Sequence, residues 1–260
     1  MQIAISTGLY YKKNYNEILD IIKASGCKNI ELFLNQAFID LSIDEIKEAI
    51  ESRGLSVTSI HLPLTFIAYS RDESEEFWIQ KGLEYLDILG GKVLVSHFFY
   101  LPHDKNANND AAHFNNMKNF NEITTMYVCT ENLPNIDLDT KLKAKSALLT
   151  ELKDKNIVMT FDTTHAASHE GDLVEDYKDF KEYIRNIHLS DYLDGNEHKV
   201  LGTGNLPIKK LIKELVKDGY KYSLTLEYDF ENSSRNIVTD DDHAIELLQE
   251  SISYIQACLV

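Results

Sequence analysis

The sequence has 260 residues and a formal net charge of −16 at pH 7, with 26 Lys and Arg against 42 Asp and Glu. Such an acidic surface repels phosphate backbones, so a nucleic-acid partner is disfavoured. No stretch approaches the roughly 18 consecutive apolar residues of a membrane span. The three cysteines lack CxxC spacing, which argues against a disulfide framework. The first residues lack the basic flank and cleavage site of a signal peptide, so we expect a cytoplasmic protein.

Eight short apolar runs, most of them rich in β-branched residues, are predicted to be strands. They occupy residues 3–6, 29–33, 56–60, 93–96, 125–130, 157–161, 184–187 and 221–226. The run at 157–161 lacks the polar alternation of a half-exposed strand, which is typical of a strand that is buried on both faces.

Amphipathic segments separate most of these runs and are predicted to be helices. Asn14 with Glu17, and Ser42 with Glu45, have the spacing of capping boxes at helix starts. Helices are expected at about residues 14–25, 42–53, 74–89, 139–153, 205–218 and 242–256, with one more between the sixth and seventh strands. Residues 98–120 are rich in Asn and His, and we expect a long loop there with at most a short helix.

Strand and helix alternate eight times without a linker or a break in composition. Eight such units in about 250 residues are typical of an α/β fold, the (β/α)8 TIM barrel, and we expect a single domain over residues 1–260. A doubly wound open sheet is the rival fold. It is disfavoured because no glycine-rich phosphate loop follows the first strand, where Gly8 is the one glycine.

An acidic or imidazole side chain accompanies the end of seven predicted strands. These residues are Glu31, His61, His97, Glu131, Asp162, His188 and Glu227. In a barrel the C-terminal ends of all strands share one face, which is where TIM barrels carry out their chemistry. We therefore expect these side chains to surround a single mouth.

A cluster of this kind predicts a bound divalent metal ion. Several carboxylates buried together without a cation would be costly, and a divalent ion removes that cost. The mix of carboxylate oxygen and imidazole suits Mn, Zn, Co or Fe better than Ca. The expected cofactor is a divalent ion, with Mn, Zn, Co and Mg as candidates. Any one of these residues alone would more often be an ordinary loop residue, so the prediction depends on their repetition.

At these residues the sequence resembles the xylose-isomerase-like barrels. This superfamily includes sugar and sugar-phosphate isomerases and epimerases, and also the endonuclease IV type of abasic-site nuclease. The motifs that carry the resemblance occur in the right order along the chain: Ser59-Ile60-His61-Leu62-Pro63, Val95-Ser96-His97, Thr130-Glu131-Asn132, Phe161-Asp162-Thr163-Thr164-His165, Ile187-His188-Leu189-Ser190-Asp191, His198 with Leu201-Gly202-Thr203-Gly204, and Leu226-Glu227.

The epimerase branch implies a mechanism for this set of residues. One divalent metal is implied to be held by Glu131, Asp162, His188 and Glu227. The two glutamates are implied to act as acid and base on opposite faces of the sugar, through an enediolate. His165 corresponds to the substrate-contacting histidine of the family. The arginine that epimerases often carry after the seventh strand is missing from residues 194–199.

The endonuclease branch is the alternative, and it implies nine ligands that hold three zinc ions. Eight positions match: His61, His97, Glu131, Asp162, His165, His188, His198 and Glu227. The ninth ligand, an Asp, is replaced by Asn196, which is a poorer neutral ligand, and the acidic charge also disfavours DNA. We therefore expect additional metal-binding or substrate-binding roles for four histidines: His61, His97, His165 and His198.

Our first hypothesis is a metal-dependent isomerase or epimerase of a small sugar or sugar phosphate, with a homo-oligomer left open. A barrel that binds a ligand without turnover is a third reading, against which the pair of glutamates argues. Gly202 and Gly204 resemble a phosphate-cradling turn, or simply permit a tight turn. Four other histidines are expected to be exposed in loops or at a helix start: His103, His113, His169 and His243.

Overall fold

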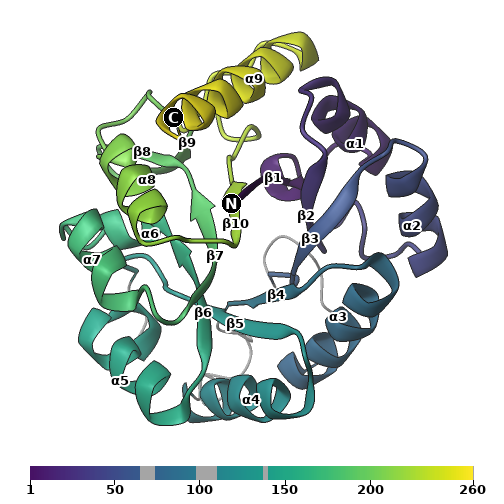
Figure 1. Cartoon of the computed structure of the whole chain (residues 1–260). Coiled ribbons are helices and arrows are strands. Elements are labelled where there is room, and N and C mark those ends of the chain that lie inside the picture. Colours follow the sequence, from purple (N-terminus) through teal and green to yellow (C-terminus); the bar gives the residue numbers. More distant parts are fainter. Residues whose placement is uncertain (65–73, 98–109, 137–139, 260) are drawn as a thin grey trace.

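The computed structural model describes residues 1–64, 74–97, 110–136 and 140–259 of the chain. Eight parallel strands close into a barrel in the order β1-β10-β7-β6-β5-β4-β3-β2. Figure 1 looks down this barrel and shows the helices arranged around its outside. The (β/α)8 TIM barrel predicted from the sequence is therefore confirmed.

All eight predicted barrel strands are present, within a few residues of their expected bounds. They are β1 Gln2–Ser6, β2 Asn29–Phe33, β3 Ser56–His61, β4 Val93–Ser96, β5 Tyr127–Glu131, β6 Val158–Asp162, β7 Ile184–Leu189 and β10 Ser223–Leu226. Side chains alternate along each strand, so some point into the barrel and their neighbours pack between the barrel and the surrounding helices. In β6, Phe161 contacts Phe180 of the surrounding helical layer, whereas Asp162 faces the inside of the barrel mouth.

The helices form the outer layer. They are α1 Tyr15–Ala24, α2 Ile43–Glu51, α3 Glu75–Leu89, α4 Asp110–Ile123, α5 Lys145–Lys155, α6 Thr163–Ala167, α7 Leu173–Phe180, α8 Ile208–Lys217 and α9 Asp241–Cys258, with the 3-10 helices η1 Thr7–Leu9 and η2 Lys141–Lys143. Asn14 and Ser42 each form the predicted capping box. None of the helices in the described ranges is long and apolar enough to cross a membrane.

The expectation of at most a short helix within residues 98–120 was wrong. Helix α4 has 14 residues, and its first residue is Asp110. Phe114, Met117 and Phe120 bury their side chains against the barrel, and Asn121 exchanges hydrogen bonds with the backbone of Val128 in β5. These tertiary contacts stabilise a helix whose local sequence, rich in Asn, gives it little support.

A small hairpin follows β7 and was not predicted. Its strands are β8 Asp191–Leu193 and β9 Asn196–Lys199, which pair antiparallel. Asp194 and Gly195 make the turn with φ values of 50° and 80°, as the Asp-Gly pair favours in two-residue hairpin turns. Glu197 and His198 of this hairpin line the pocket at the barrel mouth, so the hairpin contributes side chains to the site described below.

The first and last strands of the barrel pair with each other, and so do the loops that follow them. Ile5 lies beside Leu226 in the parallel register of β1 and β10. Beyond the strands, the amide of Phe230 donates to Leu9 O at 3.0 Å, and the amide of Lys12 donates to Glu231 Oε1 at 3.0 Å. The part of the mouth that these loops form is thus built from segments far apart in the sequence.

Candidate metal centre

Four side chains converge from the ends of four neighbouring strands at the barrel mouth. Glu131 ends β5, Asp162 ends β6, His188 lies near the end of β7, and Glu227 follows β10. One ligand atom of each lies within 4.8 Å of those of the other three. Nδ1 of His188 lies 2.9 Å from Glu131 Oε1 and 2.9 Å from Glu227 Oε2. The structure thus brings together the four residues for which the sequence predicted a shared metal.

The orientation of Asp162 fits a metal ligand. Its Oδ1 accepts hydrogen bonds from the amides of Thr164, at 2.8 Å, and His165, at 2.6 Å, which caps helix α6. Its Oδ2 is buried and accepts no hydrogen bond from the residues that the structure describes. An unpaired buried carboxylate oxygen is costly, and a cation among these four residues would remove that cost.

A fifth residue, Glu31, contacts His188 from inside the barrel. Both side chains are fully buried. Ser59 Oγ and Asn186 Nδ2 donate to Glu31 at 2.8 Å and 3.0 Å. Glu31 lies in the middle of β2 and therefore inside the barrel, not at its mouth as the sequence led us to expect.

Charge around His188 controls its protonation. Burial alone would lower the pKa of His188, but the carboxylates of Glu131, Glu227 and Glu31 raise it well above its ordinary value. Burial alone would raise the pKa of Glu31, but the positive charge of His188 lowers it. A cation at this place is therefore electrostatically favoured, whether it is a proton or a metal ion.

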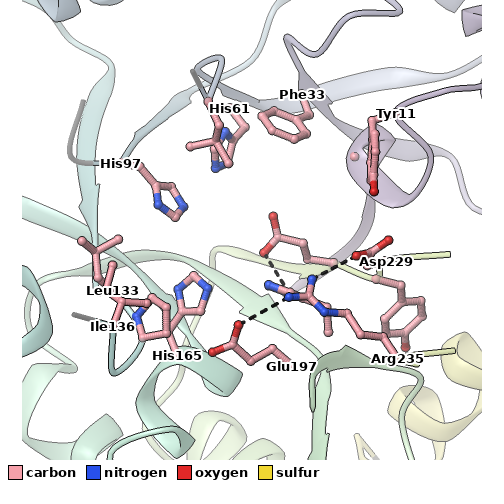
Figure 2. Close-up of a pocket in the computed structure, with 16 residues that line it drawn as sticks. Tyr11, Phe33, His61, His97, Leu133, Ile136, His165, Glu197, Asp229 and Arg235 are labelled. Atoms are coloured by element: carbon pink, nitrogen blue, oxygen red, sulfur yellow. Dashed lines mark hydrogen bonds and ion pairs between the residues drawn. The ribbon is translucent and has the colours of Figure 1, made fainter. Parts of the chain in front are cut away.

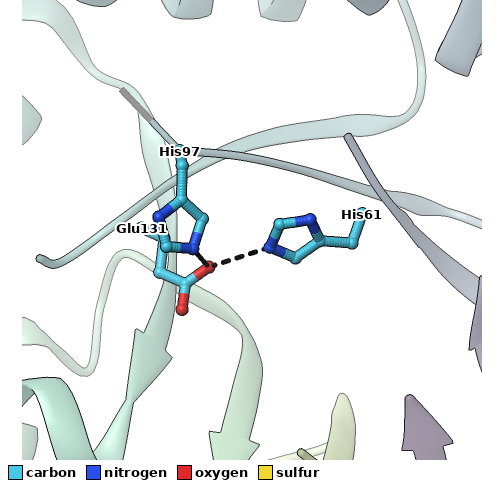
Figure 3. A group of neighbouring side chains, drawn as sticks. All are labelled: His61, His97 and Glu131. Atoms are coloured by element: carbon cyan, nitrogen blue, oxygen red, sulfur yellow. Dashed lines mark ion pairs between the residues drawn. The ribbon is translucent and has the colours of Figure 1, made fainter. Parts of the chain in front are cut away.

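A second group shares Glu131 with the first (Figure 3). Nε2 of His97 lies 2.8 Å from Glu131 Oε2, and Nε2 of His61 lies 3.6 Å from the same oxygen. The ligand atoms of the three residues lie within 4.8 Å of one another. Nδ1 of His61 lies 2.7 Å from Leu62 O. This contact orients the ring so that Nε2 faces the carboxylate.

A third group consists of His165, His198 and Glu197, again with ligand atoms within 4.8 Å of one another. Asn196, at the position of the ninth ligand of the nuclease pattern, does not belong to it, and its amide donates to Asp194 O. Neighbouring residues of a regular strand point to opposite faces. His198 has a φ of 54°, and this irregular backbone allows both Glu197 and His198 to line the pocket.

Glu227 and the histidines of the second and third groups line a pocket of about 290 Å³. Figure 2 shows His97 and His165 on one side of it, and Tyr11, Asp229 and Arg235 on the other. Apolar side chains from the end of β2 and from loops complete the wall: Phe33, Leu64, Leu133, Pro134 and Ile136. A small polar molecule with one apolar face fits such a lining.

Arg235 and Asp229, which lie in the loop after β10, were not predicted as site residues. Arg235 Nη1 donates to Asp229 Oδ2 at 3.0 Å, and its Nη2 lies 3.8 Å from Glu197 Oε2. Asp229 Oδ1 also accepts from the amides of Glu231 and Asn232, which fixes the loop that carries Arg235. A positively charged side chain is therefore present at the mouth. It lies in the loop after β10, the eighth strand of the barrel, and not in the loop after β7, the seventh.

The turn at Gly202 and Gly204 already holds an anion, which is the side chain of Asp191. The amides of Gly202 and Gly204 donate to Asp191 Oδ2 at 2.9 Å and 3.0 Å, and the amide of Leu206 donates to Oδ1 at 3.0 Å. A Cβ at position 204 would collide with this carboxylate and with Tyr192 O. Close approach by Asp191 explains the glycine, and the turn needs no phosphate.

The closed barrel and the ring of carboxylates and imidazoles at its mouth define a TIM barrel with a candidate metal centre. A family model described as xylose isomerase-like TIM barrel matches residues 19–258. The chain belongs to this family, as its motifs predicted.

Similarity to individual proteins is lower. An uncharacterized protein of Methanocaldococcus jannaschii is 24% identical over 133 residues, which are 51% of this chain and 48% of that protein. The alignment thus spans about half the length of this curated relative.

Solved structures share the fold over the whole chain. A D-tagatose 3-epimerase-like protein has a TM-score of 0.75 at 18% identity, with 100% of both chains covered. L-ribulose 3-epimerase has a TM-score of 0.73 at 20% identity, with 100% of this chain and 95% of that chain covered. D-allulose 3-epimerase from Methylomonas sp. has a TM-score of 0.77 at 15% identity, with 100% and 98% covered.

Proposed function

We propose that the protein is a metal-dependent isomerase or epimerase of a small sugar. The observation that carries the proposal is the convergence of Glu131, Asp162, His188 and Glu227, whose ligand atoms lie within 4.8 Å of one another. Three structurally similar proteins are named as sugar 3-epimerases or as similar to one, which supports the same class of reaction.

The residues present fit a divalent ion, since two glutamates, one aspartate and one imidazole supply a mixed oxygen and nitrogen ligand set. The buried Asp162 Oδ2, which accepts no hydrogen bond within the described part of the chain, supports this fit. When bound, the ion would supply Lewis acidity to the substrate oxygens next to the reacting carbon. Mn, Zn, Co and Mg remain the candidates.

Glu131 and Glu227 are proposed to move the proton. One carboxylate takes the proton from the carbon beside the substrate carbonyl, and the other returns a proton to the opposite face. Glu227 lines the pocket, and its side chain is 14% exposed. Glu131 is fully buried and is contacted by both His97 and His188. These environments keep the two groups distinct in solvent access.

The test is exchange of the substrate carbon-bound hydrogen with deuterium from the solvent. Glu227→Gln and Glu131→Gln should each abolish exchange and retain the circular dichroism of the wild type. Glu246→Gln, at an exposed position of α9, is the matched control and should exchange at the wild-type rate. Retained exchange in either pocket variant would refute its role.

The nuclease alternative gains no support from the three structures cited above, none of which is a nuclease. The same preparation separates the two functions. Two or three zinc ions per chain together with cleavage of a duplex containing an abasic site would favour the nuclease. We expect sugar exchange without cleavage.

A further inference from the structure

We propose that the pocket selects an uncharged sugar over the phosphate ester of the same sugar. This inference rests on the proposed function and names its substrate class. It follows from how the structure has already used two features that could bind a phosphate, namely Arg235 in the pocket wall and the turn at Gly202 and Gly204 before α8.

The lining of the pocket is acidic. Glu197, Glu227 and Asp229 contribute three carboxylates to the wall, and Arg235 is the one Arg or Lys among the described residues that line it. Charges in a half-enclosed cleft are screened less than on an open surface. A divalent ion bound by Glu227 and the other three proposed ligands would offset the charge of Glu227, but Glu197 and Asp229 lie outside that group of four. These two carboxylates outnumber the one guanidinium, so a phosphate dianion beside them would meet net repulsion.

The positive charge of Arg235 is already balanced. Its Nη1 donates to Asp229 at 3.0 Å, and its Nη2 lies 3.8 Å from Glu197. The guanidinium side chain is 29% exposed, so part of it still faces the pocket. A guanidinium has five N–H donors in a fixed plane. The donors that remain can bind neutral hydroxyl oxygens without adding net charge to the pocket.

The second feature is closed to an outside anion. The amides of Gly202, Gly204 and Leu206 all donate to the carboxylate of Asp191, which is itself 2% exposed. The N-terminal approach to helix α8 is one of the places where a barrel of this kind could bind phosphate. Here the protein supplies its own anion, so a phosphate would have to displace a buried carboxylate.

The rest of the wall favours a polyol. Two aromatic side chains line the pocket: Tyr11 lies on the same side as Asp229 and Arg235, and Phe33 lies beside His61. Sugars present an apolar C–H face and a rim of hydroxyls. Aromatic rings pack against the C–H face, and a neighbouring guanidinium and carboxylate can donate to and accept from the hydroxyls.

The experiment compares free sugars with their esters in the metal-loaded full chain. The probes are D-allulose, D-tagatose and L-ribulose and their terminal monophosphates, measured by solvent deuterium exchange and by isothermal titration calorimetry. We expect each free sugar to bind at least tenfold more tightly than its ester and to exchange at least tenfold faster. Equal or tighter binding of an ester, or no binding of any probe, would overturn the inference.

Calorimetry separates this inference from the proposed function. Tenfold tighter binding of free sugars without any exchange would contradict the proposed epimerase and still support selection against phosphate. Faster exchange of an ester would support the epimerase and overturn the inference.

Two variants locate the selectivity. Glu197→Gln removes one carboxylate beside Arg235, so the ester-to-free-sugar affinity ratio should rise at least threefold. Glu250→Gln, exposed on α9, should leave the ratio unchanged. Arg235→Met should weaken free-sugar binding at least fivefold, whereas Lys210→Met, exposed on α8, should not. An unchanged ratio in Glu197→Gln would count against the electrostatic explanation.

Discussion

Nε2 of His188 lies 3.0 Å from Glu31 Oε1, while Nδ1 on the other side of the ring faces Glu131 and Glu227. The imidazole therefore joins a carboxylate inside the barrel to the candidate ligands at its mouth. A histidine that binds a metal through one nitrogen commonly donates its other N–H to such a carboxylate, which fixes the ring and strengthens the ligand.

Glu31→Gln should weaken metal binding without removing any of the four candidate ligands. The amide keeps the size of the side chain but loses the charge that holds His188. We expect an affinity loss of about 10- to 100-fold, the range for groups that support a metal ligand. Competition with a chromogenic chelator measures it. Glu48→Gln on α2 is the control, and unchanged affinity in Glu31→Gln would contradict a supporting role.

Metal removal should lower the thermal stability of the chain. Without a cation, Glu131, Asp162 and Glu227 gather near one another at the mouth, with His188 as their shared neighbour. Binding at 100 times the Kd would contribute about 2.7 kcal/mol, which corresponds to a rise in Tm of about 5–10 °C for a chain of this size. Differential scanning fluorimetry of chelator-treated protein, with Mn, Zn, Co or Mg added back, measures the change. The absence of any shift would contradict binding at this place.

Glu75 in α3 should contribute a pH-dependent part of the stability. It accepts hydrogen bonds from Ser96 Oγ at 2.9 Å and Asn116 Nδ2 at 3.0 Å, and it contacts Nδ1 of His113. Burial alone would raise the pKa of Glu75, but His113 and these hydrogen bonds hold it below its ordinary value. The stabilisation is therefore present above the unfolded pKa of about 4.3, and it is lost as the pH falls through the lower folded pKa.

Glu75→Gln should cost about 1–3 kcal/mol of unfolding free energy at pH 7. The difference from the wild type should shrink in urea titrations below about pH 4.3, for the reason just given. Glu76→Gln, exposed on the same helix, should have no such effect. A difference that stays constant down to the lowest pH at which both proteins fold would rule out the charge of Glu75 as the cause.

Gly204→Ala should destabilise the turn that precedes α8. An added Cβ would lie 2.5 Å from Tyr192 O and still closer to Asp191 Oδ1, and the backbone oxygen cannot move aside cheaply. Overpacking of this kind costs about 1–3 kcal/mol. Gly171→Ala is the matched control, since its Cβ would meet only the end of the Asp176 side chain. Equal unfolding free energies for the two variants would contradict the crowding at Gly204.

Sequence alone predicted the barrel and the four converging residues, because parallel strands in a closed barrel must bring their C-terminal ends to one face. Each of Glu131, Asp162, His188 and Glu227 is marked by an apolar run directly before it. The depth of Glu31 was missed. β2 continues to Phe33, so a residue in the middle of the same apolar run lies one level below the mouth.

Other parts of the site depend on irregular backbone conformation, which the hydrophobic periodicity of the sequence does not predict. Glu197 reaches the pocket beside His198, whose left-handed backbone interrupts the strand. The Asp194-Gly195 pair was the available signal for that hairpin. Arg235 lies in an irregular loop whose shape depends on Asp229. The prediction that His113 is exposed was wrong, because Glu75 and Thr130 hold the ring in a buried position. His169 is exposed, as predicted. His103 lies outside the described residues.

Pairing of β1 with β10 has a consequence for synthesis of the protein. Tyr11 and Arg235 line the same pocket, yet the ribosome makes them more than two hundred residues apart. A nascent chain therefore has no complete binding site until β10 has emerged and docked beside β1. Contacts between such distant segments form late and slowly. Until that moment Leu9 and Lys12 lack the hydrogen bonds with Phe230 and Glu231 that close this part of the mouth.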